Sequence, residues 1–396
     1  MKKRTYGTVI RGIRTPIITK GDDLVQIISD SLGEFAEAEN VSFGDRDIVG
    51  VTEAVIARAQ GNYVTVDQVA QDVRAKFGSD EIGVIFPILS RNRFAVCLRG
   101  IAKAFKKVYL MLSYPSDEVG NALFDDMLLE SSGVNPYTDI LSEADFKRLF
   151  GESKHPFTGL NYIEYYKQII EESGADAEII FANNAKAILN YTSNIICCDI
   201  HTRFKSKSRL EDAGAKIVLG LDDICVSPVN NSGYNEKYGL LGSNKSTEDL
   251  LKLFPRDCET FVDALAKNLS ERFNKQIEVL VYGDGAFKDP QGKIWELADP
   301  VVSPAYTQGL DGLPSEIKLK YITDNKFSDL KGRELEQAVI SYIKNKERDA
   351  SDMDKQGTTP RRITDLLGSL CDLSSGSGDK GTPVILIQGY FDNLST

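Results

Sequence analysis

The sequence predicts a mixed α/β protein in which a doubly wound α/β domain is inserted between two less regular blocks. Three observations lead to this prediction. Residues 81–222 alternate short apolar strands with short helices, residues 1–80 alternate strand and helix, and residues 223–396 mix helices with two isolated apolar runs. Apolar strands that alternate with helices are typical of a parallel sheet covered on both faces. We therefore expect three parts, at 1–80, 81–222 and 223–396.

The first block begins with a strand, "TYGTVIRGI" (5–13), and a turn from Pro16 to Gly21. A helix that starts at Asp22 gathers its apolar side chains on one face. The segment "DIVGV" (47–51) reads as a second strand. These elements predict a strand–helix–strand start to the chain.

The helix "TVDQVAQDVRAKFG" carries signals at both of its ends. Thr65 and Gln68 have the spacing of a capping box, and Gly78 is placed to stop the helix. An apolar stripe between them indicates one buried face.

The middle block supplies the strands of the predicted parallel sheet. "IGVIFPIL" (82–89) is the first, and Ser90 is expected to cap the helix after it. Further strands are "KVYLMLSY", "AEIIFAN", "NIICCDI" and "AKIVLGL", with helical segments between them.

In the last block we expect helices at about 247–273, 333–348 and 360–371. They would surround a buried strand at 277–283 and a final strand, "PVILIQGY" (383–390).

Composition excludes several classes of protein. The net charge of −11 opposes a nucleic-acid surface, because phosphate backbones require a basic face. No run of 18 apolar residues exists, so we expect no membrane span. Six cysteines without CxxC spacing indicate reduced, packed thiols. We expect a cytoplasmic protein, and a homodimer.

Carboxylates gather beyond the strand "IEVLVY". Asp284 follows Gly283 at the strand's end, a rigid position that suits a metal ligand. Glu53, after "VGV", is either a second ligand or an acid that complements a helix dipole. Asp289 and Asp299 are expected to be solvated loop carboxylates.

The glycine-rich segment "GSGDKG" (376–381) matches the letters of a dinucleotide fingerprint. It precedes a strand, whereas the fingerprint follows a strand and opens a helix, so we reject that interpretation. Two alternatives stay open: a plain turn, or a loop whose amides approach phosphate.

His201 follows "IICCDI", at the expected carboxyl end of a strand, where α/β sheets bind ligands. It is either a surface or packed histidine, or part of an "HTR" group that meets an anionic acceptor.

Five segments together resemble one family, the coenzyme F-420 gamma-L-glutamyl ligases. They are "TPIITKGDDLVQII" (15–28), "DIVGVTEAVIARAQG" (47–61), "SPVNNSGYN" (227–235), "VLVYGDG" (279–285) and "GSGDKGTPVILIQG" (376–389). The resemblance implies a ligase-like core made from both ends of the chain. It leaves 81–222 without a counterpart in the family's short members.

The resemblance also implies a site. The residues implied to bind nucleotide are Pro16, Ile17, Ile18, Thr19, Thr52, Glu53, Arg58, Gly376, Gly378, Lys380 and Gly381. The implied metal ligands are Asp284, Asn231 and Asp379. Three positions depart from the family: Arg58 replaces a lysine, Asn231 replaces an aspartate, and Gly285 replaces a threonine.

By resemblance, the expected function is an amide ligation that uses GTP and Mg²⁺ or Mn²⁺ to add an amino acid, such as glutamate, to an acidic acceptor. An acyl phosphate would activate the carboxylate, and the metal would neutralise polyphosphate charge. The alternatives are a nucleotide-binding protein that has lost ligation, and a metal-dependent phosphotransferase or phosphatase.

Overall fold

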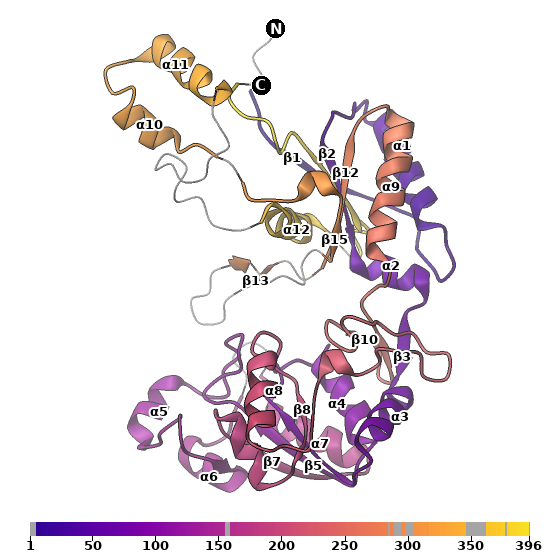
Figure 1. Ribbon diagram of the computed structural model, residues 1–396, viewed down its shortest axis with the longest axis vertical. Helices are drawn as coiled ribbons and strands as arrows, with labels where there is room; N and C mark the ends of the chain where they lie inside the picture. Colours follow the sequence, from indigo (N-terminus) through magenta and orange to yellow (C-terminus); the bar gives the residue numbers. More distant parts are fainter. Residues whose placement is uncertain are drawn as a thin grey trace. The chain divides into compact units, whose positions relative to one another are not determined.

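The structure, a computed structural model, describes residues 5–154, 159–283, 286–288, 295–297, 304–314, 316–345, 362–376 and 378–395. These residues divide into two compact units, each with helices and sheets (Figure 1), so the expected mixed α/β class is confirmed. Unit 1 takes those within 1–59, 257–287 and 295–396, and unit 2 takes those within 60–256 and 288–294.

Unit 1 is built around a five-stranded sheet with the order β1-β16-β2-β12-β15. Its strands and short pairs are β1 (Val9–Ile13), β2 (Asp47–Thr52), β12 (Ile277–Tyr282), β13 (Ala286–Lys288), β14 (Trp295–Leu297), β15 (Ala305–Tyr306) and β16 (Val384–Gln388). Its helices are α1 (Leu24–Ala38), α2 (Glu53–Gln60, whose last residue falls in unit 2), α9 (Cys258–Phe273), η4 (Gln308–Leu310), α10 (Leu319–Asn325), α11 (Gly332–Lys344) and α12 (Ile363–Ser374).

Both ends of the chain meet in this sheet. β1 pairs antiparallel with β16, and β16 pairs antiparallel with β2. Every residue of β2 and of β12 is buried, because α1 and α9 pack on one face of the sheet and α12 on the other. Segments from both ends of the chain therefore share one sheet and its core.

Unit 2 holds a six-stranded and a three-stranded sheet. Its strands are β3 (Tyr63–Thr65), β4 (Glu81–Ile85), β5 (Lys107–Leu112), β6 (Leu141–Ser142), β7 (Asp176–Phe181), β8 (Asn194–Cys197), β9 (Ile217–Gly220), β10 (Asn244–Thr247) and β11 (Leu250–Lys252). Its helices are α3 (Val66–Phe77), α4 (Phe94–Ala102), α5 (Asp126–Ser132), α6 (Glu143–Phe150), α7 (Tyr162–Glu172), η1 (Ala185–Asn190), α8 (Arg203–Asp212) and η2 (Leu221–Asp223).

The larger sheet of unit 2 has the order β6-β7-β5-β4-β8-β9. All neighbouring pairs are parallel except β6 with β7. The chain runs outward from β4 through β5 to β7, and then returns to the other side of β4 as β8 and β9. This is a doubly wound sheet, and its direction reverses between β4 and β8.

Separate cores cover its two faces. The larger cluster includes buried side chains of α3, α4 and α7, and the smaller one includes those of η1 and α8. Unit 2 reaches beyond the expected 81–222 domain at both ends. α3 packs against α4, and β3 joins β10 and β11 in the small sheet, so these flanking segments share its core.

Two local expectations are wrong. Residues 247–257 do not begin a helix: β10 ends at Thr247, β11 returns beside it as a hairpin, and α9 starts only at Cys258, after Pro255. Ser90 does not cap α4, because the helix begins at Phe94 with Arg93 at its N-cap position. The backbone N–H of Ser90 instead donates to the hydroxyl of Tyr166, at 2.8 Å.

Candidate active site

Four strands of unit 1 bring separate segments to one edge of the sheet. Ile13 of β1 is paired with Val384 of β16, Val384 with Val51 of β2, and Val51 with Val281 of β12. Just beyond this row, β1, β2 and β12 end and β16 begins. The ends of four distant segments of the chain therefore meet at this edge.

The turn after β1 has an anchored base and an open tip. Ile18 is buried in the core, whereas Pro16 and Thr19 are exposed and Ile17 is 85% exposed. The backbone N–H of Thr19 donates to Asp22 Oδ2 at 2.6 Å, and that of Gly21 donates to the Ala59 carbonyl at 2.8 Å. Gly21 has a φ of +92°, which favours glycine. These two hydrogen bonds fix the base of the turn, and Ile17 lies at its exposed tip.

Thr52 and Glu53 lie buried at the end of β2. The backbone N–H of Thr52 donates to the Pro383 carbonyl at 3.0 Å, which joins this strand end to the segment before β16. Glu53 is only 4% exposed, and a Cβ placed on Gly283 would lie 2.6 Å from Glu53 Cγ. Gly283 thus makes room for this acid.

The charge of Glu53 affects the pKa of its neighbour Cys258. Burial raises the pKa of the Cys258 thiol to about 12, and the Glu53 carboxylate adds to that rise. Since Glu53 is in the first turn of α2, its carboxylate also complements the positive end of the helix.

The glycine-rich segment forms a closed loop before β16. The backbone N–H of Thr382 donates to the Gly376 carbonyl at 3.0 Å, and that of Gly381 to the Gly378 carbonyl at 3.2 Å. Gly381 has a φ of +63°. Asp379 and Lys380 are exposed at the loop's tip. Thr382 packs against Gly12, so the base of the loop is fixed on β1.

The remaining residues of the predicted site are on α2, in unit 2 or outside the described residues. Arg58 is exposed on α2. Asn231 is exposed in unit 2, in a left-handed backbone conformation with a φ of +59°. Asp284 and Gly285 lie outside the described residues, as do Asp289 and Asp299.

Oxygen donors predominate at this edge. The Glu53 carboxylate, the Thr52 hydroxyl and the Asp379 carboxylate are ligand types that Mg²⁺ and Mn²⁺ accept. Within the described part of the chain, no group of three or more His, Cys, Asp or Glu residues is arranged to hold a metal ion. A metal here would need oxygens in addition to those of the described acids.

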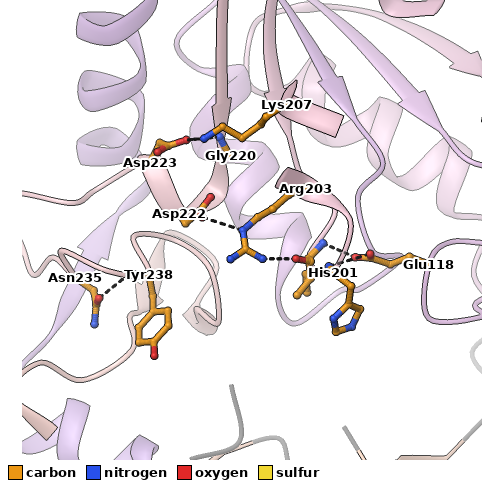
Figure 2. Close-up of polar contacts among 10 residues, drawn as sticks. Glu118, His201, Arg203, Lys207, Gly220, Asp222, Asp223, Asn235 and Tyr238 are labelled. Carbon is orange, nitrogen blue, oxygen red and sulfur yellow. Dashed lines mark hydrogen bonds and ion pairs between the residues drawn. The ribbon is translucent and has the colours of Figure 1, made fainter. Parts of the chain in front are cut away.

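A second polar cluster lies at the carboxyl edge of the doubly wound sheet of unit 2 (Figure 2). Glu118, in the loop after β5, accepts from the backbone N–H groups of Ile200 and His201, the latter at 3.1 Å. Arg203 Nε donates to Asp222 Oδ2 at 2.8 Å, and Lys207 is paired with Asp223. His201 itself is exposed, at the end of β8 where the sequence placed it.

The sequence analysis missed two acids of this cluster, Asp117 and Glu118. Asp117 is buried and accepts from the backbone N–H of Leu89 at 2.9 Å and from that of Asn121 at 2.8 Å. Burial raises the pKa of both carboxyl groups, and the backbone N–H groups that bind them lower it in part. The sequence signal that could have identified these two acids is their position just after an expected strand of the parallel sheet.

None of the helices in the described part of the chain has both the length and the apolar character that a bilayer span requires.

Comparison with protein families gives one result. A model described as F420-0:gamma-glutamyl ligase matches residues 12–389, which include both units. No curated protein matches the chain.

Proposed function

The chain belongs to the F420-0:gamma-glutamyl ligase family, and from that premise we propose that it joins glutamate to an acidic acceptor at the expense of GTP. Family membership supports a glutamate ligase activity with small-molecule substrates. The use of GTP, of Mg²⁺ or Mn²⁺ and of an acyl phosphate is the finer part of the proposal.

One observation carries the proposal: the ends of four distant segments converge at one edge of the sheet in unit 1. The turn at 15–22, the end of β2 and the loop at 376–382 belong to three of the five segments that resemble the family. A substrate at this edge can touch all three, although more than 320 residues separate the first from the last.

The reaction has two steps. A carboxylate oxygen of the acceptor attacks the γ-phosphorus of GTP, the bond to the β–γ bridging oxygen breaks, and GDP leaves with its electron pair. The glutamate amine then attacks the acyl carbon of the mixed anhydride, phosphate leaves, and the nitrogen loses its proton.

The chain's own groups would bind and orient these substrates. The exposed tip of the turn at 15–22, and Gly378 and Gly381, which face open space, permit close backbone approach to a nucleotide. Lys380 would offset phosphate charge. Thr52 and Glu53 would supply oxygens from the floor of the site.

A divalent metal fits the oxygen-rich character of this edge. Glu53 and Asp379 would hold it, with Asp284 as the ligand implied by the resemblance. When bound, such an ion neutralises charge on the phosphate oxygens.

The test is an assay with the purified full chain, the acceptor F420-0, glutamate, GTP and either Mg²⁺ or Mn²⁺. We expect an acceptor whose mass increases by one glutamyl residue, with GDP and phosphate released in equal amounts. Parallel reactions without glutamate, without metal, and with ATP in place of GTP identify what the reaction requires.

The outcomes separate the candidate functions. Phosphate release without amide product would favour a phosphatase. Nucleotide binding without turnover would favour a protein that has lost ligation, and either result would overturn the proposal.

A further inference from the structure

The carboxyl edge of the doubly wound sheet belongs to unit 2, whereas the loops of the proposed ligation site belong to unit 1. In sheets of this kind, ligands bind where the strand order reverses, outside the carboxyl ends of the strands. Here the reversal lies between β4 and β8. A ligand is therefore expected beside the loops that follow these two strands.

Two acids, the buried Asp117 and the half-buried Glu118, fix the geometry of this edge. Asp117 ties the loop after β5 to the loop after β4 through the Leu89 N–H. Glu118 ties the same loop to the one after β8 through the N–H groups of Ile200 and His201. The three loops form a connected frame rather than three independent segments.

Arg203 is the cation held within this frame. Its Nε donates to Asp222 Oδ2 at 2.8 Å, and its Nη1 donates to the Ile200 carbonyl. The exposed ring of Phe204 lies against the guanidinium, 4.4 Å from the ring centroid. Among the described residues nothing accepts a hydrogen bond from Nη2, and the side chain is 17% exposed.

The free end of this guanidinium is well placed to bind a ligand. Figure 2 shows it directed to the side of the close-up on which the rings of His201 and Tyr238 also lie. A guanidinium fixed on two sides loses little side-chain entropy when its remaining edge binds an oxyanion in the two-point manner typical of arginine. Lys207, on the same helix, differs because its ammonium is paired with Asp223.

Nearby charge limits the kind of oxyanion. Asp199 Oδ1 and Asp222 Oδ1 are both buried, and neither has a hydrogen-bond partner in the described part of the chain. Unsatisfied buried polar atoms are rare in folded proteins and call for an explanation. A carboxylate group carries one charge, even in a dicarboxylate, whereas inorganic phosphate concentrates up to two charges on one group, so these acids would repel phosphate more strongly.

We propose that this edge is a second small-molecule site, in which Arg203 binds the carboxylate of a small organic acid. The site does not depend on the proposed ligation, because its residues all belong to the sheet of unit 2 and its ligand requires neither nucleotide nor metal.

The experiment titrates the full-length protein with glutarate, a dicarboxylate without an amine, in a low-salt buffer that contains EDTA and no nucleotide. Isothermal calorimetry should show saturable binding to the wild type and at least about tenfold weaker binding to Arg203→Lys. Lysine keeps the positive charge but lacks the planar guanidinium that binds an oxyanion at two points. The matched control Lys207→Met, on the same helix, should bind as the wild type does. Inorganic phosphate should bind more weakly than glutarate.

A second measurement uses the wild type alone, so its result does not depend on whether the Arg203→Lys protein folds. Phenylglyoxal modifies accessible arginines, and peptide mass spectrometry locates the product. Glutarate should protect Arg203 and leave the exposed Arg148 of α6 unprotected. Absence of saturable glutarate binding, equal affinity in a folded Arg203→Lys protein, phosphate binding as tight as glutarate binding, or an unprotected Arg203 would each overturn the proposal. None of these results bears on the ligase assay, which is measured separately.

Discussion

Glu53 combines burial with a position at the edge where the ends of four segments meet. A buried carboxylate is unfavourable unless other groups compensate its charge, and the start of α2 supplies part of that compensation. Gly283 leaves space for its side chain. At the scale of single residues, this acid is the described group best suited to hold a cation or orient a phosphate.

Replacement of Glu53 by Gln should preserve the fold and impair metal-dependent nucleotide binding. Gln keeps the shape but removes a charge, so we expect at least about a tenfold loss of affinity, which is 1.4 kcal/mol. Calorimetry with GTP and Mg²⁺ measures it. The exposed Glu271→Gln on α9 is the control. Wild-type affinity in a folded Glu53→Gln protein would exclude Glu53 from the site.

The resemblance implies that Asp284 binds the metal, so Asp284→Asn should also weaken metal-dependent nucleotide binding by at least about tenfold. Circular dichroism should show that the fold is retained, because the strand before Asp284 is buried independently of that side chain. Unchanged metal-dependent affinity in the folded variant would place the metal elsewhere.

The six cysteines are all buried, and burial raises the pKa of each thiol. For Cys97 it reaches about 11 and for Cys258 about 12, against an ordinary value of 9.0. A group whose pKa is raised on folding stabilises the folded state below its unfolded pKa and loses that contribution as the pH rises through its folded value. The free energy of unfolding should therefore fall as the pH rises from about 9 toward 12.

Urea unfolding at pH 8 and pH 10 tests this thiol effect. The midpoint should be lower at pH 10, and replacement of Cys258 by Ser should reduce the difference. Iodoacetamide at pH 8 should modify the native thiols far more slowly than those in urea, because only the thiolate reacts. Rapid native alkylation would contradict the burial of these side chains.

At the scale of elements, α3 shows how completely local sequence can specify a helix. The predicted capping box is present: Gln68 N–H donates to Thr65 Oγ1 at 3.2 Å, and Thr65 N–H donates to Gln68 Oε1 at 2.9 Å. The predicted stop is present as well, since Gly78 has a φ of +56° and its N–H donates to the Arg74 carbonyl at 3.1 Å. Val69 and Val73 lie in the core of unit 2, as the apolar stripe predicted.

Replacement of Thr65 by Ala should therefore destabilise unit 2 by about 1 kcal/mol, the usual cost of losing such a cap. Thr65→Ser keeps the hydroxyl and serves as the control. Equilibrium urea denaturation, followed by circular dichroism, measures the difference. Equal stability of the Ala and Ser variants would show that the cap contributes nothing.

At the scale of the whole molecule, the part of unit 2 within 60–256 is one continuous segment. Its two ends are held together: Gln60 Nε2 donates to the Arg256 carbonyl at 2.6 Å, and Arg256 N–H donates to Gln60 Oε1 at 2.9 Å. Arg256 also donates to Asn62 Oδ1 at 2.6 Å. A continuous segment with adjacent ends and its own core has the anatomy of an inserted domain.

A fragment of residues 60–256 should therefore fold alone, with circular dichroism typical of an α/β protein and a cooperative unfolding transition. Limited proteolysis of the full chain should cut near its borders before it cuts inside β8. A fragment without cooperative unfolding, or early cleavage inside β8, would contradict its independence.

Much of the fold could be read from local patterns. The buried strands β2, β5, β12 and β16 appear near their predicted positions, because an apolar run bounded by turn residues needs no partner to be recognised. The errors arose where tertiary contacts override local preference. Residues 244–252 form a hairpin whose second strand, β11, pairs with β3, almost 190 residues earlier in the sequence, and Ser90 is held by Tyr166 rather than serving as a cap.

The sequence by itself determined the mixed α/β class, the alternating strands of the doubly wound sheet and the motifs that resemble a ligase. Each of these depends on neighbours within a few residues, so the chain carries the signal locally. Only the tertiary structure decided that β1 lies beside β16, that Glu53 is buried next to Gly283, and that Asp117 and Glu118 connect three loops around Arg203. These arrangements depend on strand register and on packing between distant segments, which no local pattern records.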